Sequence, residues 1–182
     1  RDRSRGVKDF TSARLLTKGK QTFQYGRIDV RAALPEGQGM WPAIWMLGAN
    51  IDEVGWPACG EIDIMEMVGG GENDAVTHGT VHWDAGGQYA NFGGSTSVDD
   101  GRLSDEFHVY SIVWDEEFIT WYLDDEQYHV IDIRPETLSE FRDEFYLLLN
   151  VAVGGNWPGS PDASTLFPQW MIIDYIRYFQ PE

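Results

Sequence analysis

The segment Gly60–Val68, which reads GEIDIMEMV, contains the residues best suited to chemistry in this sequence. Two-residue alternation along a strand places Glu61 and Asp63 on one face and the intervening isoleucines on the other. Unbroken alternation would turn Glu66 into the apolar layer, where an ionised carboxylate is costly. We therefore predict a β-bulge at Ile64-Met65, because one extra residue returns Glu66 to the acidic face.

The spacing of the acidic residues indicates glycoside hydrolysis. A rise of about 3.3 Å per residue, shortened by the bulge and by side chains that lean together, brings the carboxyl groups of Glu61 and Glu66 to roughly 5–6 Å. That distance is typical of a nucleophile and an acid/base in a retaining glycosidase. Because three neighbouring carboxyl groups repel, we expect at least one to stay protonated above the usual acid range.

Two other interpretations of the acidic strand remain open at this point. Its carboxylates would also suit an ordinary solvated strand face. Clusters of Asp and Glu also bind Ca²⁺ through oxygen ligands.

Aromatic side chains lie just upstream of the acidic strand. Trp41 and Trp45 share one face of the predicted strand, with the small Ala43 between them, and indole rings can stack on the apolar face of a sugar. Taken singly, each ring is more typical of the core, because aromatic side chains dominate cores by area, and the position just upstream of the acidic strand favours a binding role. Trp56 lies in the loop that leads into the acidic strand and could border a cleft, while Trp157 is either a loop anchor or a substrate contact.

Histidines follow on the next predicted strand, where His78 and His82 share a face. A histidine near a carboxylate can orient it or form a hydrogen bond to a sugar hydroxyl. The single cysteine, Cys59, excludes an intramolecular disulfide and has no evident His partner for nucleophilic chemistry.

Short alternating runs separated by Gly, Pro, Asn and Asp predict an all-β sandwich or barrel. The single helical candidate is Pro135–Phe145, Asp124-Asp125 is a predicted hairpin turn, and the glycine-rich Gly86-Gly87 and Gly93-Gly94 are predicted loops. The predicted strands are Thr11–Leu16, Thr22–Leu34, Met40–Leu47, Glu61–Val68, Thr77–Trp83, Phe107–Trp114, Phe118–Leu123, Gln127–Ile131, Tyr146–Val153 and Trp170–Phe179.

Composition narrows the class of protein. The 182 residues fit one domain, and 42% hydrophobic residues with 8 Trp indicate a globular chain. A net charge of −17 argues against nucleic-acid binding, because contacts with phosphates would be repulsive. No apolar run approaches the roughly 20 residues of a membrane span. The first residue is Arg rather than Met, which indicates a processed product.

These segments together carry a family resemblance. Gly60–Glu66 resembles the E-x-D-x-x-E signature of glycoside hydrolase family 16 in its laminarinase-like branch. Further segments resemble the same branch in the same order: Thr11–Leu15, Tyr25–Arg27, Leu34–Met46, Gly55–Pro57, His82-Trp83, Asn150–Gly159 and Asp174–Tyr178.

The resemblance implies a β-jelly-roll sandwich of two antiparallel sheets with a substrate cleft on its concave face. It implies that Glu61 is the nucleophile, that Glu66 is the acid/base, and that Asp63 tunes their protonation. Residues 1–182 would form a single catalytic domain of a secreted, extracellular enzyme. No cofactor is expected for catalysis.

The resemblance also implies the binding residues. Trp41, Trp45, Trp56 and His82 would line the sugar subsites, together with Asn150 and Trp157. Asp174 matches a position that often helps to bind a structural Ca²⁺ on the convex side. The expected partner is a polysaccharide, with no nucleic acid and no membrane.

The bulged signature points to an endo-β-1,3-glucanase acting on laminarin, because lichenases usually carry the shorter E-x-D-x-E. The alternatives are a mixed-linkage β-1,3-1,4-glucanase and a non-catalytic β-glucan-binding module. The chain departs from the family pattern before its first matching segment. Domains of the family carry further N-terminal strands there, whereas only Arg1–Phe10 precede the Thr11–Leu15 segment in this sequence. We therefore expect a second chain or a missing segment to complete the sandwich.

Overall fold

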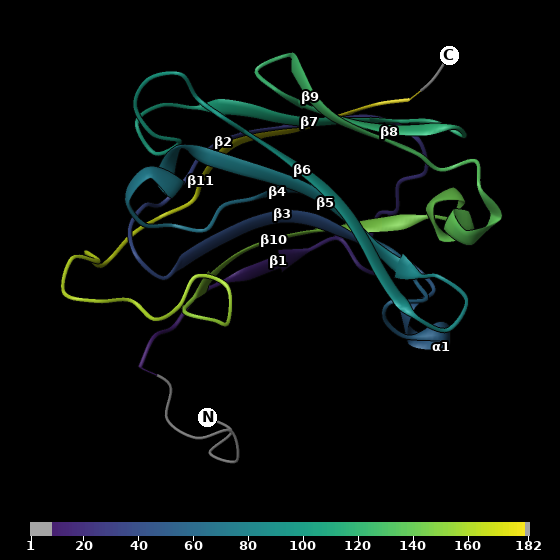
Figure 1. The fold of residues 1–182 in the computed structure, drawn as a ribbon, viewed down its shortest axis with the longest axis horizontal. Helices are drawn as coiled ribbons and strands as arrows, with labels where there is room; N and C mark the ends of the chain where they lie inside the picture. Colours follow the sequence, from purple (N-terminus) through teal and green to yellow (C-terminus); the bar gives the residue numbers. More distant parts are fainter. Residues whose placement is uncertain (1–8, 181–182) are drawn as a thin grey trace.

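Two antiparallel β-sheets lie face to face in the computed structural model of this chain, which describes residues 9–180. Figure 1 shows them as two layers, with strands β7, β8 and β9 in one and β1, β3 and β10 in the other. The six-stranded sheet has the order β1-β10-β3-β4-β5-β6, and the five-stranded sheet has the order β11-β2-β7-β8-β9. This arrangement confirms the predicted all-β sandwich.

The strands are β1 (Arg14–Leu16), β2 (Gly26–Ala33), β3 (Met40–Gly48), β4 (Glu61–Glu66), β5 (Val76–Asp84), β6 (Tyr89–Ser97), β7 (His108–Trp114), β8 (Phe118–Leu123), β9 (Glu126–Asp132), β10 (Phe145–Val153) and β11 (Ile172–Phe179). A short helix α1 spans Ile51–Val54, and 3-10 turns span Gly71–Ala75 and Glu136–Arg142. Within residues 9–180, no helix is long and apolar enough to cross a membrane.

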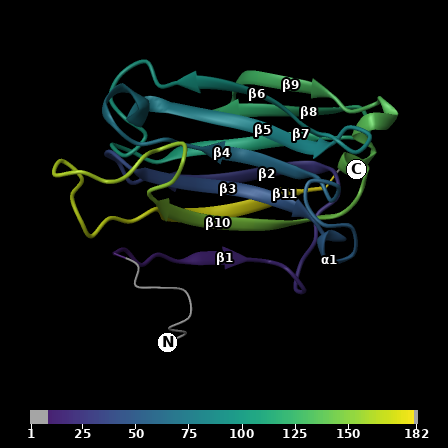
Figure 2. The ribbon, with the colours of Figure 1, turned by 60° about the horizontal axis from the view of Figure 1, so that its bottom comes forward.

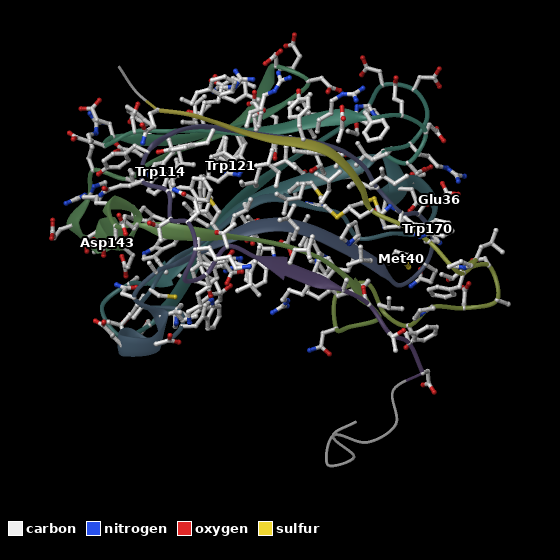
Figure 3. All side chains as sticks on the ribbon, turned by 180° about the vertical axis from the view of Figure 1, so that it is seen from behind. Glu36, Met40, Trp114, Trp121, Asp143 and Trp170 are labelled. Atoms are coloured by element: carbon white, nitrogen blue, oxygen red, sulfur yellow. The ribbon has the colours of Figure 1, made fainter. Side chains whose placement is uncertain are left out.

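The core lies between the two sheets and is built from the inward residues of each strand. Trp114 and Trp121 of the five-stranded sheet are fully buried there, and Figure 3 shows both between the layers. Burial of such side chains contributes about 1.5–3 kcal/mol each. Trp121 also donates a hydrogen bond of 2.8 Å from Nε1 to the carbonyl oxygen of Asp63, so the core directly supports the acidic strand.

The sandwich is closed along one side and open along the other. Strands β6 and β9 approach each other at the closed side, where Phe92 packs on His129 with ring centroids 5.0 Å apart. Strands β1 and β11 are the opposite edges of their sheets. Figure 2 shows β1 beyond β10 at this margin. The open margin therefore lies between one edge strand of each sheet.

Strand β6 corrects the prediction that Gly93-Gly94 forms a loop. Its whole length pairs with β5, and the glycines are needed because the sheets approach closely there. A Cβ atom on Gly94 would lie 2.6 Å from Nδ1 of His129. The glycines therefore mark close contact between strands and not chain flexibility.

The local predictions elsewhere had mixed outcomes. Asp124 and Asp125 have φ angles of 49° and 68°, as a tight hairpin between β8 and β9 requires, which confirms that prediction. The Pro135–Phe145 candidate contains a 3-10 turn over Glu136–Arg142, and Phe145 already belongs to β10. The prediction of a single helical segment was wrong, because α1 and the Gly71–Ala75 turn also form.

Candidate active site

The strand register contains the irregularity predicted for the acidic segment. On β3, Ile44 is opposite Met65 and the adjacent Trp45 is opposite Asp63, so Ile64 is the extra residue. Ile64 and Met65 are both buried in the core. The bulge therefore lets two consecutive apolar side chains point inward while Glu66 joins Glu61 and Asp63 on the outer face.

Three ring nitrogens surround the carboxyl groups of this strand. Trp56 Nε1 donates to Glu61 Oε2 at 2.7 Å, and Trp41 Nε1 donates to Glu66 Oε1 at 2.9 Å. His82 Nε2 lies 3.0 Å from Asp63 Oδ2, an ion-pair distance, although the ring is not aligned for a hydrogen bond to that oxygen. Indole donors thus fix the orientation of both glutamates.

Burial raises the pKa of all three acids. The pKa of Glu61 rises to about 7, mainly through burial and then through the neighbouring charge of Asp63. Burial raises the pKa of Glu66, with Glu61 adding repulsion and the Trp41 hydrogen bond opposing it. Asp63, which is 2% exposed, has a pKa well above its ordinary value because of burial. The cluster therefore holds at least one proton near neutral pH.

The deepest acid is the best place for that proton. A charge on Asp63 is the most costly of the three, because this carboxyl is almost entirely removed from solvent. Once Asp63 is neutral, its repulsion of Glu61 disappears and the Glu61 carboxylate ionises more easily. Asp63 can thereby keep Glu61 available as a nucleophile while Glu66 retains a raised pKa.

One end of the site is walled by aromatic rings. Trp157, from the loop after β10, packs edge-on against Trp41 with ring centroids 5.7 Å apart. It also contacts His78, which is opposite Glu66 on β5, at 5.0 Å. Trp157 is 47% exposed, so it contacts the site and still presents surface to solvent.

A second aromatic position lies on the β10 side of the acids. Trp45 Nε1 donates to Asn150 Oδ1 at 2.9 Å, so the predicted contact residue Asn150 orients this indole. Arg14 of β1 stacks over the same ring at 5.2 Å. The predicted pair Trp41 and Trp45 thus lies on the outer face on either side of Ala43, beside the acids.

Tyr89, at the opposite end of the site, is a residue that the sequence analysis missed. It packs against the predicted residue Trp56, which is 52% exposed, with ring centroids 5.3 Å apart. Tyr89 also contacts His82, through a 2.7 Å hydrogen bond and ring stacking. The alternation of Tyr89 and Asn91 could have indicated a strand, but the glycines that follow were interpreted as a loop.

Asp174 is the one predicted site residue that the structure places away from this cluster. It lies on β11 in the other sheet and accepts a 2.7 Å ion pair from Arg31. A guanidinium partner does not suit a cation site, and among residues 9–180 no group of three His, Cys, Asp or Glu side chains gathers around it. Calcium binding at Asp174 stays a prediction.

A carboxylate metal site on β4 has some geometric support. Ligand atoms of Glu61, Asp63 and His82 lie within 4.8 Å of one another. However, an indole N–H points at Glu61, and Ca²⁺ requires six to eight oxygen ligands. The donor set therefore fits hydrogen-bonded carboxyl groups better than a calcium ion.

Comparison with known proteins identifies the family of the chain. Residues 5–177 match the family described as Glycosyl hydrolases family 16. The chain is 42% identical to a beta-glucanase of Rhodothermus marinus over 188 aligned positions, which cover 95% of this chain and 63% of that protein. It therefore spans less than two thirds of the length of this curated relative.

Solved structures give the same relationship. The laminarinase catalytic domain from Thermotoga maritima MSB8 superimposes with a TM-score of 0.83 at 47% identity, covering 93% of this chain and 69% of that one. An endo-1,3-beta-glucanase (laminarinase) catalytic domain from Thermotoga petrophila RKU-1 gives a TM-score of 0.83 at 48% identity, covering 92% and 68%. These similarities confirm the predicted β-jelly-roll sandwich.

Proposed function

The chain belongs to glycosyl hydrolase family 16, and on this premise we propose that it is an endo-β-1,3-glucanase that retains anomeric configuration. The observation that carries this proposal is the bulged strand β4, which presents Glu61, Asp63 and Glu66 together on an outer face walled by indole rings. The similarity to laminarinases supports β-1,3-glucan as the substrate class.

The proposed reaction has two steps. Glu61 attacks the anomeric carbon while Glu66 protonates the leaving glycosidic oxygen, so the C1–O bond breaks and a Glu61–C1 ester bond forms. Glu66, now ionised, then takes a proton from water as the water attacks C1 and releases Glu61. Two inversions at C1 give net retention.

The surrounding residues have separate tasks in this proposal. The Trp56 N–H orients the Glu61 carboxylate, and the Trp41 N–H orients Glu66. Asp63 holds a proton that would otherwise bind to Glu61 and remove the charge of this nucleophile. The half-buried rings of Trp41 and Trp45 and the exposed ring of Trp157 offer stacking surfaces for successive glucose units.

A digestion panel tests the proposal. The protein should cut laminarin into short oligosaccharides and leave agarose intact, with the β-anomer released first in the NMR spectrum of the products. Initial release of the α-anomer would refute retention. Faster cleavage of lichenan or barley glucan than of laminarin would favour the mixed-linkage alternative.

The non-catalytic alternative makes a different prediction. A β-glucan-binding module would bind laminarin by calorimetry without producing new reducing ends. Both glutamates are present and held by indole donors, which supports catalysis over binding alone. A calcium-dependent β4 site would instead lose thermal stability on chelation, and the catalytic proposal expects no such change from this cluster.

We also propose that the protein works outside the cell, because its proposed substrate is a polysaccharide too large to enter freely.

The open margin between β1 and β11 suggests a further partner. A hollow of about 710 Å³ lies between β1, β10 and the segment before β11, lined by Leu15, Met40, Leu149, Val151, Trp170 and Ile173. We call this the seam, and Figure 3 shows Met40 near Trp170 there.

The seam suits an added β-strand. Strands β1 and β11, on either side of the seam, are the edges of their sheets, and edges with exposed apolar side chains favour pairing with another strand. Leu15 and Trp170 are 61% and 67% exposed. We propose that a strand from a second chain or a further segment covers these side chains and completes the sandwich.

A further inference from the structure

Tyr89 connects the cleft wall to the acidic cluster through one histidine. It begins β6, and its hydroxyl lies 2.7 Å from Nδ1 of His82. The two rings are stacked, with 14° between their planes and centroids 5.8 Å apart. Tyr89 is 50% exposed and supports Trp56 on its other side. It therefore belongs to the site without touching the carboxyl groups through its hydroxyl.

The other nitrogen of His82 faces the buried acid. Nε2 lies 3.0 Å from Asp63 Oδ2, and that oxygen is buried without an aligned hydrogen-bond partner. The hydrogen bond to Tyr89 is therefore the aligned contact that holds the imidazole. In a neutral imidazole only one nitrogen carries a proton, and the partner of the other nitrogen decides which one.

We propose that Tyr89 is a positioning residue that fixes the orientation and tautomer of His82, and through it the ring nitrogen that faces the buried Asp63 carboxyl group. The inference rests on the proposed glucanase function and deepens it. Removal of the Tyr89 hydroxyl would let the His82 ring rotate and exchange tautomers. The ring nitrogen that faces Asp63 would then lose its fixed position and its fixed protonation state. The effect should appear in turnover and not in substrate affinity.

The groups that face His82 make the cluster the main electrostatic influence on its ring. Glu61 and Asp63 face it from β4, with Glu66 one bulge further along that strand. His78 shares its face of β5, and Tyr89 faces it from β6. Among residues 9–180, Arg14 stacks on Trp45 and Lys18 lies over Tyr146 on this face of the sheet, so both basic side chains contact rings other than that of His82.

A double-mutant cycle tests the route through His82. Tyr89→Phe keeps the ring and should lower kcat about five- to tenfold with KM within about twofold, because one hydrogen bond is lost. In a His82→Gln background the same change should have no further effect on kcat. Additive losses, or a raised KM with unchanged kcat, would overturn the proposal. Tyr122→Phe, on β8 in the other sheet, is the matched control and should change neither constant.

A second measurement does not depend on turnover. Nitrogen chemical shifts of the 4 histidines report the tautomer of each imidazole, and His82→Gln assigns the signal. We expect one neutral tautomer for His82 in the parent protein and a mixture in Tyr89→Phe. Equal populations in both proteins would overturn the proposal. If the shifts change but the parent protein does not cleave laminarin, the glucanase proposal fails while the control of His82 by Tyr89 stands.

Discussion

The centre of the six-stranded sheet and the seam at its edge both depart from ordinary folding rules, in opposite directions. At the centre, Asp63 is 2% exposed beside two more carboxyl groups. At the seam, Leu15 and Trp170 are 61% and 67% exposed. At the centre, indole N–H donors within the chain hold the two glutamates that flank Asp63, whereas the apolar surface of the seam lacks a cover among residues 9–180. The contrast separates the proposed site for chemistry from the proposed surface for association.

The largest expected effect comes from the removal of either central glutamate. Glu66→Gln should lower kcat on laminarin by about 10²–10⁴-fold, because general acid/base catalysis contributes that much. Glu61→Gln should lose at least as much, since no glycosyl-enzyme can form. Neither variant should lower the melting temperature. Glu126→Gln, on β9 in the other sheet, is the control for loss of a carboxylate.

These glutamate variants would contradict the contrast between the centre and the seam if loss of a carboxylate changed stability and left catalysis intact. Turnover within tenfold of the parent protein would mean that β4 is not the chemical centre. A large loss of melting temperature would mean that the carboxylates stabilise the fold, as a metal site would require.

The second prediction concerns stability and pH at the centre. The pKa of Glu61 is raised from 4.5 to about 7, so between these values the folded protein binds more protons than the unfolded chain. Stability therefore falls as pH rises through this window, and is fully retained only below it. Glu61→Gln lacks this penalty and should be more stable than the parent protein by about 1–3 kcal/mol at pH 8.

Denaturant titrations of both proteins from pH 4 to pH 8 check the sign. The advantage of Glu61→Gln should grow through the window and level off above pH 7. An advantage independent of pH would assign the gain to packing or hydrogen bonding and not to the buried charge.

The bulge and the hairpin could be predicted because local physics decides them. Burying an ionised Glu66 in the core costs far more than one extra residue in a strand, so the sequence alone predicts the irregularity. Adjacent aspartates between two alternating runs likewise indicate a tight turn.

The contacts around the acids could not be predicted, because they depend on strands that meet only in the folded sheet. The register of β5 against β6 brings Tyr89 near His82, and the glycines that permit this packing look like a loop in the sequence. The pairing of the Trp56 indole with Glu61 depends on a loop conformation that spacing does not fix. The single-domain assignment of residues 1–182 stays a prediction.

The third prediction removes one compensating donor at the centre. Trp41→Phe keeps an aromatic ring but loses the N–H that donates to Glu66. Because that hydrogen bond lowers the pKa of Glu66, its loss should raise this pKa further. The alkaline limb of the kcat/KM profile should move to higher pH, and kcat should fall about tenfold. An unchanged alkaline limb would show that another group sets it.

The smallest expected effect on stability belongs to the seam. Leu15, in the middle of β1, is 61% exposed, so Leu15→Lys should change the free energy of unfolding by less than about 0.5 kcal/mol. Association should respond more strongly, because a lysine on an edge strand opposes pairing with another strand. Sedimentation velocity over a range of concentrations should show self-association of the parent protein and less of it in the variant. Equal sedimentation of both would exclude a second copy of this chain as the strand donor, and a destabilisation of several kcal/mol would show that Leu15 packs as core. Such a destabilisation would bring the seam closer in character to the buried centre, because its apolar residues would then serve folding and not association.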